Sequence, residues 1–103
     1  MIMVSVIYPA DTGIRFDMDY YLKTHIALVR QRWTPHGMTD VRVVRGTAKA
    51  DGSAPDFRLM TLMTFTSLEA YKAAGAAHGR EVSGDVANFT DKRGVVQINE
   101  IIV

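Results

Sequence analysis

Residues 1–8 read MIMVSVIY, an apolar and β-branched stretch that Pro9 brings to an end. Such a stretch is typical of a strand, and successive side chains of a strand point to opposite faces. Both faces are apolar here, interrupted only by Ser5: Ile2, Val4, Val6 and Tyr8 form one row, and Met1, Met3 and Ile7 form the other. A strand of this kind has to be covered on both of its faces.

A helix is predicted after the turn that follows this strand. Asp17 is a plausible N-cap, because its side chain can accept a hydrogen bond from the first turn. From there the apolar residues Leu22, Ile26, Val29 and Trp33 recur at helical spacing. We expect this stripe to face the centre of the sheet.

The second half of the chain adds three strands and a second helix. The strands are predicted at 41–45, 57–65 and 95–103. The small and polar segment 46–56 indicates a long hairpin loop. Thr66 and Glu69 offer a capping box for the second helix, which Gly79 is placed to end. A short helical turn is expected within 80–93.

The predicted order is β-α-β-β-α-β, the ferredoxin-like arrangement of a four-stranded antiparallel sheet with two helices on one face. At 103 residues the chain is expected to form a single α+β domain over 1–103. The other face of the sheet would then lie open, although its strands are apolar on both sides. At ~25 cal/mol per Å² of apolar area, an uncovered face is a large loss for a small domain. We therefore expect a homodimer that packs sheet against sheet.

Composition argues against several classes of function. The net charge of +1 gives no reason to expect nucleic acid or an anionic membrane as a partner. Cysteine is absent, so disulfides, thiolate metal sites and a cysteine nucleophile are excluded. The N-terminal segment lacks the basic residues of a signal peptide and is too short to span a bilayer, which favours a cytoplasmic protein. Three dispersed histidines predict no metal site, and the lack of a glycine-rich phosphate loop predicts no nucleotide cofactor.

Three short motifs together resemble one family. They are YP at 8–9, RFDMDYYLKTH at 15–25 and FTSLEAY at 65–71. The combination resembles the EthD family, named for a protein of ethyl tert-butyl ether degradation, and the resemblance covers essentially the whole chain. It implies a dimeric α+β barrel, in which two ferredoxin-like subunits join their sheets. It also implies oxidoreductase or small-ring chemistry in a degradation pathway, because superfamily relatives include cofactor-independent monooxygenases, polyketide cyclases and muconolactone isomerases.

Tyr21 and His25 form the candidate catalytic pair. Four residues apart, they share one stripe of the predicted helix, near the rim where helix meets sheet. The imidazole of His25 suits general acid/base catalysis near neutral pH, and Tyr21 could orient it or share its proton. His25 also matches the histidine of the family signature. The alternative is a structural histidine, bonded to a backbone carbonyl or to the tyrosine.

Four further aromatic residues are candidates for substrate binding. Tyr8, at the end of the first strand, is expected at the mouth of a cavity, or alternatively fills the end of the core. The predicted apolar walls are Phe16, Phe65 and Phe89. His78, at the end of the second helix, is interpreted as a cap-region residue. It is not expected to bind haem, because the chain lacks the asparagine and tryptophan that haem-degrading relatives carry.

Two functions remain open from the sequence. The first is an enzyme without a cofactor: a homodimer with one apolar pocket per subunit, in which His25 and Tyr21 move protons on a small hydrophobic or ring-containing substrate. It would be one of three kinds of enzyme: an oxidoreductase of the monooxygenase type, a cyclase, or an isomerase. The second is a binding or accessory protein that holds a hydrophobic pathway intermediate without turnover.

Overall fold

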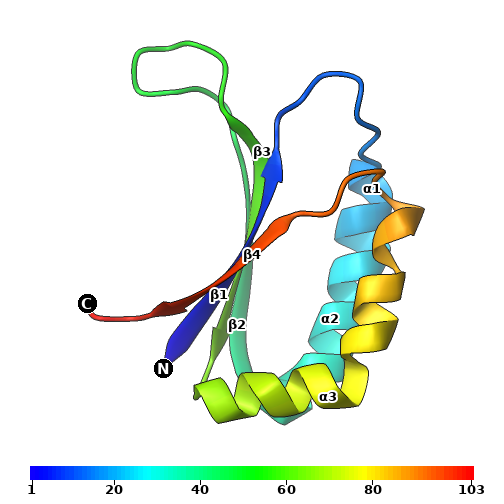
Figure 1. Cartoon of the computed structure of the whole chain (residues 1–103), viewed down its shortest axis with the longest axis vertical. Coiled ribbons are helices and arrows are strands. Elements are labelled where there is room, and N and C mark those ends of the chain that lie inside the picture. Colours follow the sequence, from blue (N-terminus) through cyan, green and yellow to red (C-terminus); the bar gives the residue numbers. More distant parts are fainter.

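The computed structural model describes residues 1–103 and follows the predicted β-α-β-β-α-β order (Figure 1). The strands are β1 (Ile2–Pro9), β2 (Met38–Arg45), β3 (Phe57–Phe65) and β4 (Val95–Glu100). They form one antiparallel sheet in the order β2-β3-β1-β4. The helical elements are α1 (Met18–Tyr20), η1 (Tyr21–His25), α2 (Ile26–Trp33), η2 (Thr34–His36), α3 (Leu68–Gly84) and η3 (Val86–Asn88). Figure 1 shows the helices together on one face of the sheet, which confirms the ferredoxin-like fold.

The elements α1, η1 and α2 are one continuous helix with a π-helical turn in its middle. Asp17 caps it as predicted, because its side chain accepts a hydrogen bond from the N–H of Tyr20 at 3.0 Å. In the π-helical turn, the N–H of Ile26 donates to the carbonyl of Tyr21, five residues back. The wider turn places Tyr21, and not Leu22, in line with Ile26 on the buried side.

This turn changes which residues of the helix are buried. Leu22 is 47% exposed, whereas Tyr21 is 1% exposed. The prediction that Leu22 faces the sheet is therefore wrong, because a spacing of 3.6 residues per turn does not hold through a π-helical turn. Beyond the turn, Val29 and Trp33 are buried as predicted.

The second helix differs from its prediction at both ends. Its N-cap is Ser67, whose Oγ accepts from the N–H of Ala70 at 3.0 Å, and not Thr66. The helix does not end at Gly79 but continues to Gly84. A glycine within a helix is less favourable than alanine by only about 1 kcal/mol, which packing readily overrides.

The continuation of α3 lies against α2 and bends on its way (Figure 1). The indole Nε1 of Trp33 donates to the carbonyl of Ala74 at 2.9 Å. A side chain that bonds to the backbone of a helix is one of the recognised causes of a bend. None of the helices has the length and apolar character needed to cross a membrane.

The core between sheet and helices has two parts. One is mainly aliphatic: Val4, Val29, Trp33, Met38, Val41, Met63, Phe65, Ala74 and Val82. The other is mainly aromatic and lies beside η1: Tyr8, Tyr21, Ile26, Leu59 and Phe89.

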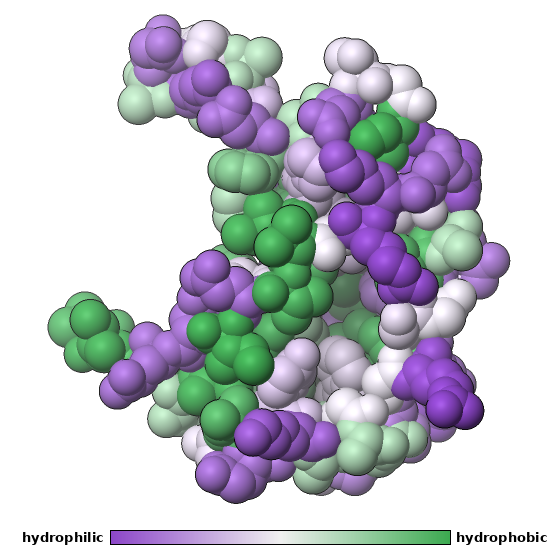
Figure 2. Space-filling view, in the orientation of Figure 1, coloured by the Kyte–Doolittle hydropathy of each residue, from purple (hydrophilic) through white to green (hydrophobic).

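Strand β4 is the least covered strand of the sheet. Val96 and Ile98 pair with Val6 and Val4 of β1 and share their helix-facing side, yet they are 55% and 48% exposed. Figure 2 shows apolar residues along β4, next to a hollow between sheet and helices, and an apolar C-terminal end that stands away from the body. The strand predicted at 95–103 ends at Glu100, which leaves the last three residues outside the sheet.

Candidate functional site

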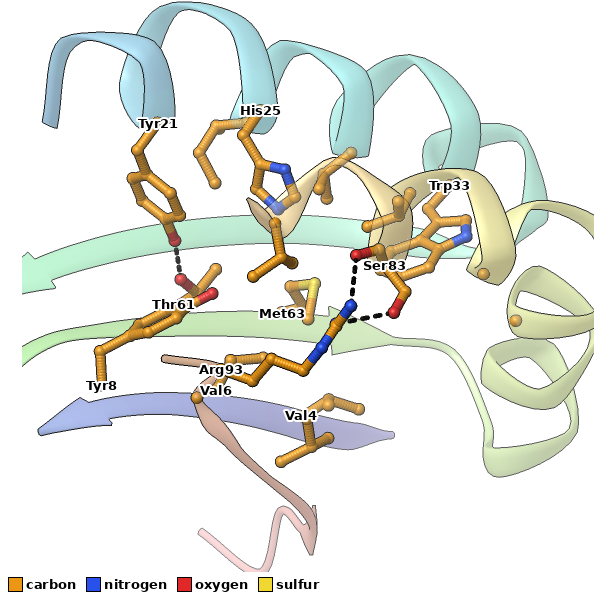
Figure 3. Close-up of a pocket in the computed structure, with 18 of the residues that line it drawn as sticks. Val4, Val6, Tyr8, Tyr21, His25, Trp33, Thr61, Met63, Ser83 and Arg93 are labelled. Carbon is orange, nitrogen blue, oxygen red and sulfur yellow. Dashed lines mark hydrogen bonds between the residues drawn. The ribbon is translucent and has the colours of Figure 1, made fainter. Parts of the chain in front are cut away.

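A cavity of about 280 Å³ opens between the sheet and the helices. Most of its lining is apolar and comes from β1, β3, β4, α2 and α3. Few polar side chains reach it, and those that matter below are Tyr8, Tyr21, His25, Thr61, Ser83 and Arg93. Figure 3 shows Tyr21 and His25 entering from the helix and Thr61 from the sheet.

His25 comes from the π-helical turn and presents one ring nitrogen to the cavity. Its Nδ1 lies 2.9 Å from Oδ2 of Asp85. Because an ionised carboxylate can only accept, Nδ1 carries the proton and Nε2 carries the lone pair. Every buried side-chain nitrogen and oxygen has a hydrogen-bond partner. Nε2 of His25 has no such partner, so this atom is not buried and is accessible from the cavity that His25 lines.

Asp85 is a site residue that the sequence analysis missed. Its carboxylate also accepts from the hydroxyl of Tyr20 at 2.6 Å and from Nδ2 of Asn88 at 2.9 Å. Burial alone would raise the pKa of Asp85, but the hydrogen bonds from Tyr20, Asn88 and His25 lower it. Asp85 is therefore ionised at neutral pH. It follows His25 by 60 residues, so no local motif connects the two.

The His25 ring is in its neutral form at neutral pH. Burial lowers its pKa below the ordinary value of 6.5, and the hydrogen bond and charge of Asp85 offset only part of that effect. A neutral imidazole with a fixed tautomer and a free Nε2 lone pair is the form that a general base requires.

Tyr21 forms a wall of the cavity beside His25. The two rings stack with centroids 5.5 Å apart and planes at 22°. The hydroxyl of Tyr21 is hydrogen-bonded to Oγ1 of Thr61 and not to His25. Burial raises the pKa of Tyr21 to about 12, although the bond from Thr61 acts to lower it. Tyr21 therefore stays protonated at neutral pH. The sequence suggested that Tyr21 could share a proton with His25, but no direct hydrogen bond joins the two side chains.

The other predicted substrate-binding residues divide into two groups. Tyr8 lines the cavity as expected, and burial raises its pKa. Phe16, Phe65 and Phe89 do not line it. Phe89 is fully buried, with its ring centroid 4.7 Å from that of His25, and Phe16 packs against Tyr8 at 5.3 Å. These rings pack against residues that line the cavity and do not line it themselves, whereas the sequence predicted that they would contact the substrate.

Arg93 is the second residue that the sequence analysis missed. It is exposed and lines the cavity, on the segment that leads into β4. Its Nη1 donates to Oγ of Ser83 at 2.8 Å, and its Nη2 donates to the Ser83 carbonyl at 3.1 Å (Figure 3). These two bonds hold the side chain against α3.

The remaining histidines lie away from this cavity. The rings of His36 and His78 have centroids 5.3 Å apart, and neither residue lines the cavity. His78 lies within α3 and not at its end, because the helix continues to Gly84. No group of three or more potential ligand side chains is placed to hold a metal ion.

Comparisons with known proteins extend these observations. The model of the EthD domain family matches residues 15–93. An EthD-like protein from Ralstonia eutropha JMP134 has 39% sequence identity and a TM-score of 0.90, covering 99% of this chain and 92% of that one. An EthD family protein from Bacillus halodurans C-125 has 23% identity and a TM-score of 0.79, covering 99% of both chains. HapK from Hahella chejuensis has the same fold at 15% identity and a TM-score of 0.59, covering 99% of this chain and 93% of its own. No curated protein matches the chain.

Proposed function

Because this chain belongs to the EthD family, we propose that it is a cofactor-independent enzyme in which His25 removes a proton from a small ring-containing substrate. The observation that carries the proposal is the pairing of His25 with Asp85, which leaves the Nε2 lone pair accessible from an otherwise largely apolar cavity. A ligand carrier would need only the apolar walls. An oriented imidazole backed by a carboxylate is what proton transfer needs.

The proposed step is one proton transfer. Nε2 of His25 takes a proton from a C–H or O–H group of the substrate, and the electron pair of the broken bond stays on the substrate. The imidazolium that forms is stabilised by the Asp85 carboxylate at 2.9 Å. In an isomerase or cyclase the same proton returns at another atom of the substrate. In a monooxygenase the substrate anion would react with molecular oxygen as the oxidant, so that one oxygen atom replaces two hydrogens on the substrate carbon and the other leaves with them as water.

The size of the cavity favours a small substrate. A cavity of about 150 Å³ is large enough to hold benzene, and this one measures about 280 Å³. One ring with substituents, or two fused rings, would fill it. The predominance of apolar walls favours a hydrophobic body for that molecule.

The working unit of this proposal is the homodimer. The exposed Val96 lines the cavity from β4, and the apolar residues Ile101 and Ile102 stand exposed beyond that strand. Burying these side chains against a second subunit would contribute to stability at ~25 cal/mol per Å². It would also narrow the side of the cavity that β4 borders.

Proton exchange tests the proposal directly. Small cyclic ketones, lactones and phenols would first be screened for binding by ligand-observed NMR, and then incubated with the protein in D₂O. We expect the protein to accelerate exchange of an acidic C–H of a bound ligand. His25→Asn should reduce that rate by about 10²-fold or more, the usual contribution of a general base.

His36→Asn is the matched control, because His36 does not line the cavity. It should leave the exchange rate unchanged. Ligands that bind without any accelerated exchange would contradict the enzyme and favour the binding protein. Accelerated exchange that persists in His25→Asn would contradict His25 as the base.

A further inference from the structure

Arg93 is the only cavity-lining residue that is charged at neutral pH. No aspartate or glutamate lines the cavity. Arg93 also takes no part in the contacts between basic and acidic side chains, whose basic members are Arg15, His25, Arg32, Arg42, Lys49 and Lys92. The wall therefore carries a positive charge that no protein carboxylate neutralises.

The arginine is positioned by groups that leave most of its donors free. Ser83 accepts two hydrogen bonds from the guanidinium, which has five N–H groups in a planar fork. Three donors remain for a ligand. The next residue, Gly94, lies so close to β1 that a Cβ there would be 2.7 Å from Cγ1 of Val6. This close approach keeps the backbone that carries Arg93 against the cavity wall.

The positive charge of Arg93 acts on the hydroxyl of Tyr8, another residue that lines the cavity. Burial raises the pKa of Tyr8, and the positive charge of Arg93 acts in the opposite direction. The walls near Arg93 include Val6 and Val96, whose low polarity strengthens attraction between charges. Arg93 is itself exposed, so an anionic group bound there keeps part of its hydration.

We propose that the substrate is a small cyclic carboxylic acid, whose carboxylate binds Arg93 while its ring lies in the apolar cavity. The negative charge of Asp85 behind His25 disfavours a second carboxylate at that position, which orients the acid group toward Arg93. Arginine suits this role because its planar N–H pairs match the two oxygens of a carboxylate. The inference rests on the proposed function for the part of the substrate that reacts at His25. What it adds is the preference for a carboxylic acid.

Matched pairs of an acid and its neutral amide test this preference. The probes are benzoate with benzamide, and 2-hydroxybenzoate with 2-hydroxybenzamide, titrated by calorimetry or NMR at low salt. We expect the native protein to bind each acid about tenfold or more tightly than its amide, as charge-assisted hydrogen bonds provide. Arg93→Gln should remove the preference, because it weakens binding of the acid much more than binding of the amide. Arg93→Lys should restore part of it.

Two further variants separate charge at the cavity from charge elsewhere. Arg80 of α3 is exposed and does not line the cavity, so Arg80→Gln should leave the preference intact. Ser83→Ala keeps the charge but removes one of the two bonds that hold it, so the preference should shrink without vanishing. Equal binding of acid and amide, an acid preference that survives Arg93→Gln, or no binding of any probe at millimolar concentration would overturn the inference.

The proton-transfer proposal can fail separately. His25→Asn should keep the preference for the acid, because the imidazole takes no part in it. An Arg93-dependent preference together with no accelerated exchange would support the acid ligand and contradict the enzyme. Accelerated exchange of neutral ligands only would support the enzyme and overturn the acid.

Discussion

Asp85→Asn removes a negative charge at a point where three donors meet. In the native protein the carboxylate accepts from Tyr20 at 2.6 Å and from Asn88 and His25 at 2.9 Å each. A carboxamide has one accepting oxygen and one donating nitrogen. The carboxamide can then bond to all three groups only if one of them becomes an acceptor, either the neutral His25 ring at Nδ1 or the hydroxyl of Tyr20. We expect the His25 ring to lose its fixed tautomer, because nothing obliges the proton to remain on Nδ1.

The size of the effect follows from the burial of the pair. The side chains of His25 and Asp85 are 7% and 13% exposed, so water screens their interaction little. A hydrogen bond to a charged group contributes about 1.5–3 kcal/mol. Since the carboxamide keeps one acceptor, we expect the free energy of unfolding to fall by ~2 kcal/mol. The exchange rate should fall by about 10²-fold, because the imidazolium formed in the transfer loses the carboxylate that stabilises it and Nε2 no longer holds the lone pair in every molecule.

The substitution also changes how stability depends on pH. Burial holds the pKa of His25 in the folded protein below its ordinary value of 6.5, and Asp85 opposes this lowering. The folded protein then binds fewer protons at His25 than the unfolded chain, so His25 makes stability fall as the pH drops below 6.5. Without the Asp85 charge the pKa of His25 falls further. In the variant, the decrease in the free energy of unfolding that His25 causes at acidic pH should therefore continue to lower pH than in the native protein.

Imidazole ¹H–¹⁵N NMR spectra report the tautomer and pKa of His25, and chemical denaturation at neutral and mildly acidic pH reports stability. Asp91→Asn is the control, since Asp91 is an exposed aspartate that pairs with Arg15 and makes no hydrogen bond to Asp85 or His25. If the Asp85 variant kept the native tautomer, the native pKa of His25 and the native stability, Asp85 would not orient the ring, and the proposed base would lose its support.

Three other outcomes can be measured with simple variants. Ile26→Ala should lower the free energy of unfolding by about 2–5 kcal/mol, whereas Leu22→Ala should change it by less than about 0.5 kcal/mol, because only Ile26 is buried; thermal melting would compare them. Sedimentation should give a homodimer, and Val96→Asp should shift it toward the 11.4 kDa monomer; a native monomer at micromolar concentration would contradict the dimer. Gly94→Ala should destabilise the protein, because its Cβ would lie 2.7 Å from Val6, whereas Gly79→Ala meets nothing within 4 Å and should stabilise α3 by up to about 1 kcal/mol in denaturant unfolding.

The fold could be predicted because its signals are local. The β-branched run before Pro9, the cap at Asp17 and the apolar strand 57–65 each indicate their element without reference to the rest of the chain. Their order then leaves few possible topologies. The errors arose where tertiary packing overrides a local preference, as at Gly79, or where the helix changes its period, as at Leu22.

The candidate site could be predicted only on its helical side. Tyr21 and His25 lie within one short motif, so their proximity follows from helical spacing. Asp85 and Arg93 reach the same region from the other end of the chain, through the path of α3 after Gly79. With the helix ending at Gly79, an aspartate and an arginine in the following segment look like ordinary solvated charges. Only the folded path brings Arg93 to the cavity and Asp85 to His25.

The π-helical turn has a consequence for how this cavity can change. In a regular α-helix, residues on one side repeat every three to four positions, so Leu22 would be in line with Ile26. The longer turn puts Tyr21 in that line instead and leaves Leu22 exposed. Removing one residue from 22–24 would place Tyr21 four positions before Ile26, which is the spacing of one side of a regular α-helix, so Tyr21 would stay on the side of Ile26. The extra residue of the turn therefore sets the spacing between Tyr21 and His25, and a one-residue deletion would disturb the stacking of their rings without turning Tyr21 away from the cavity.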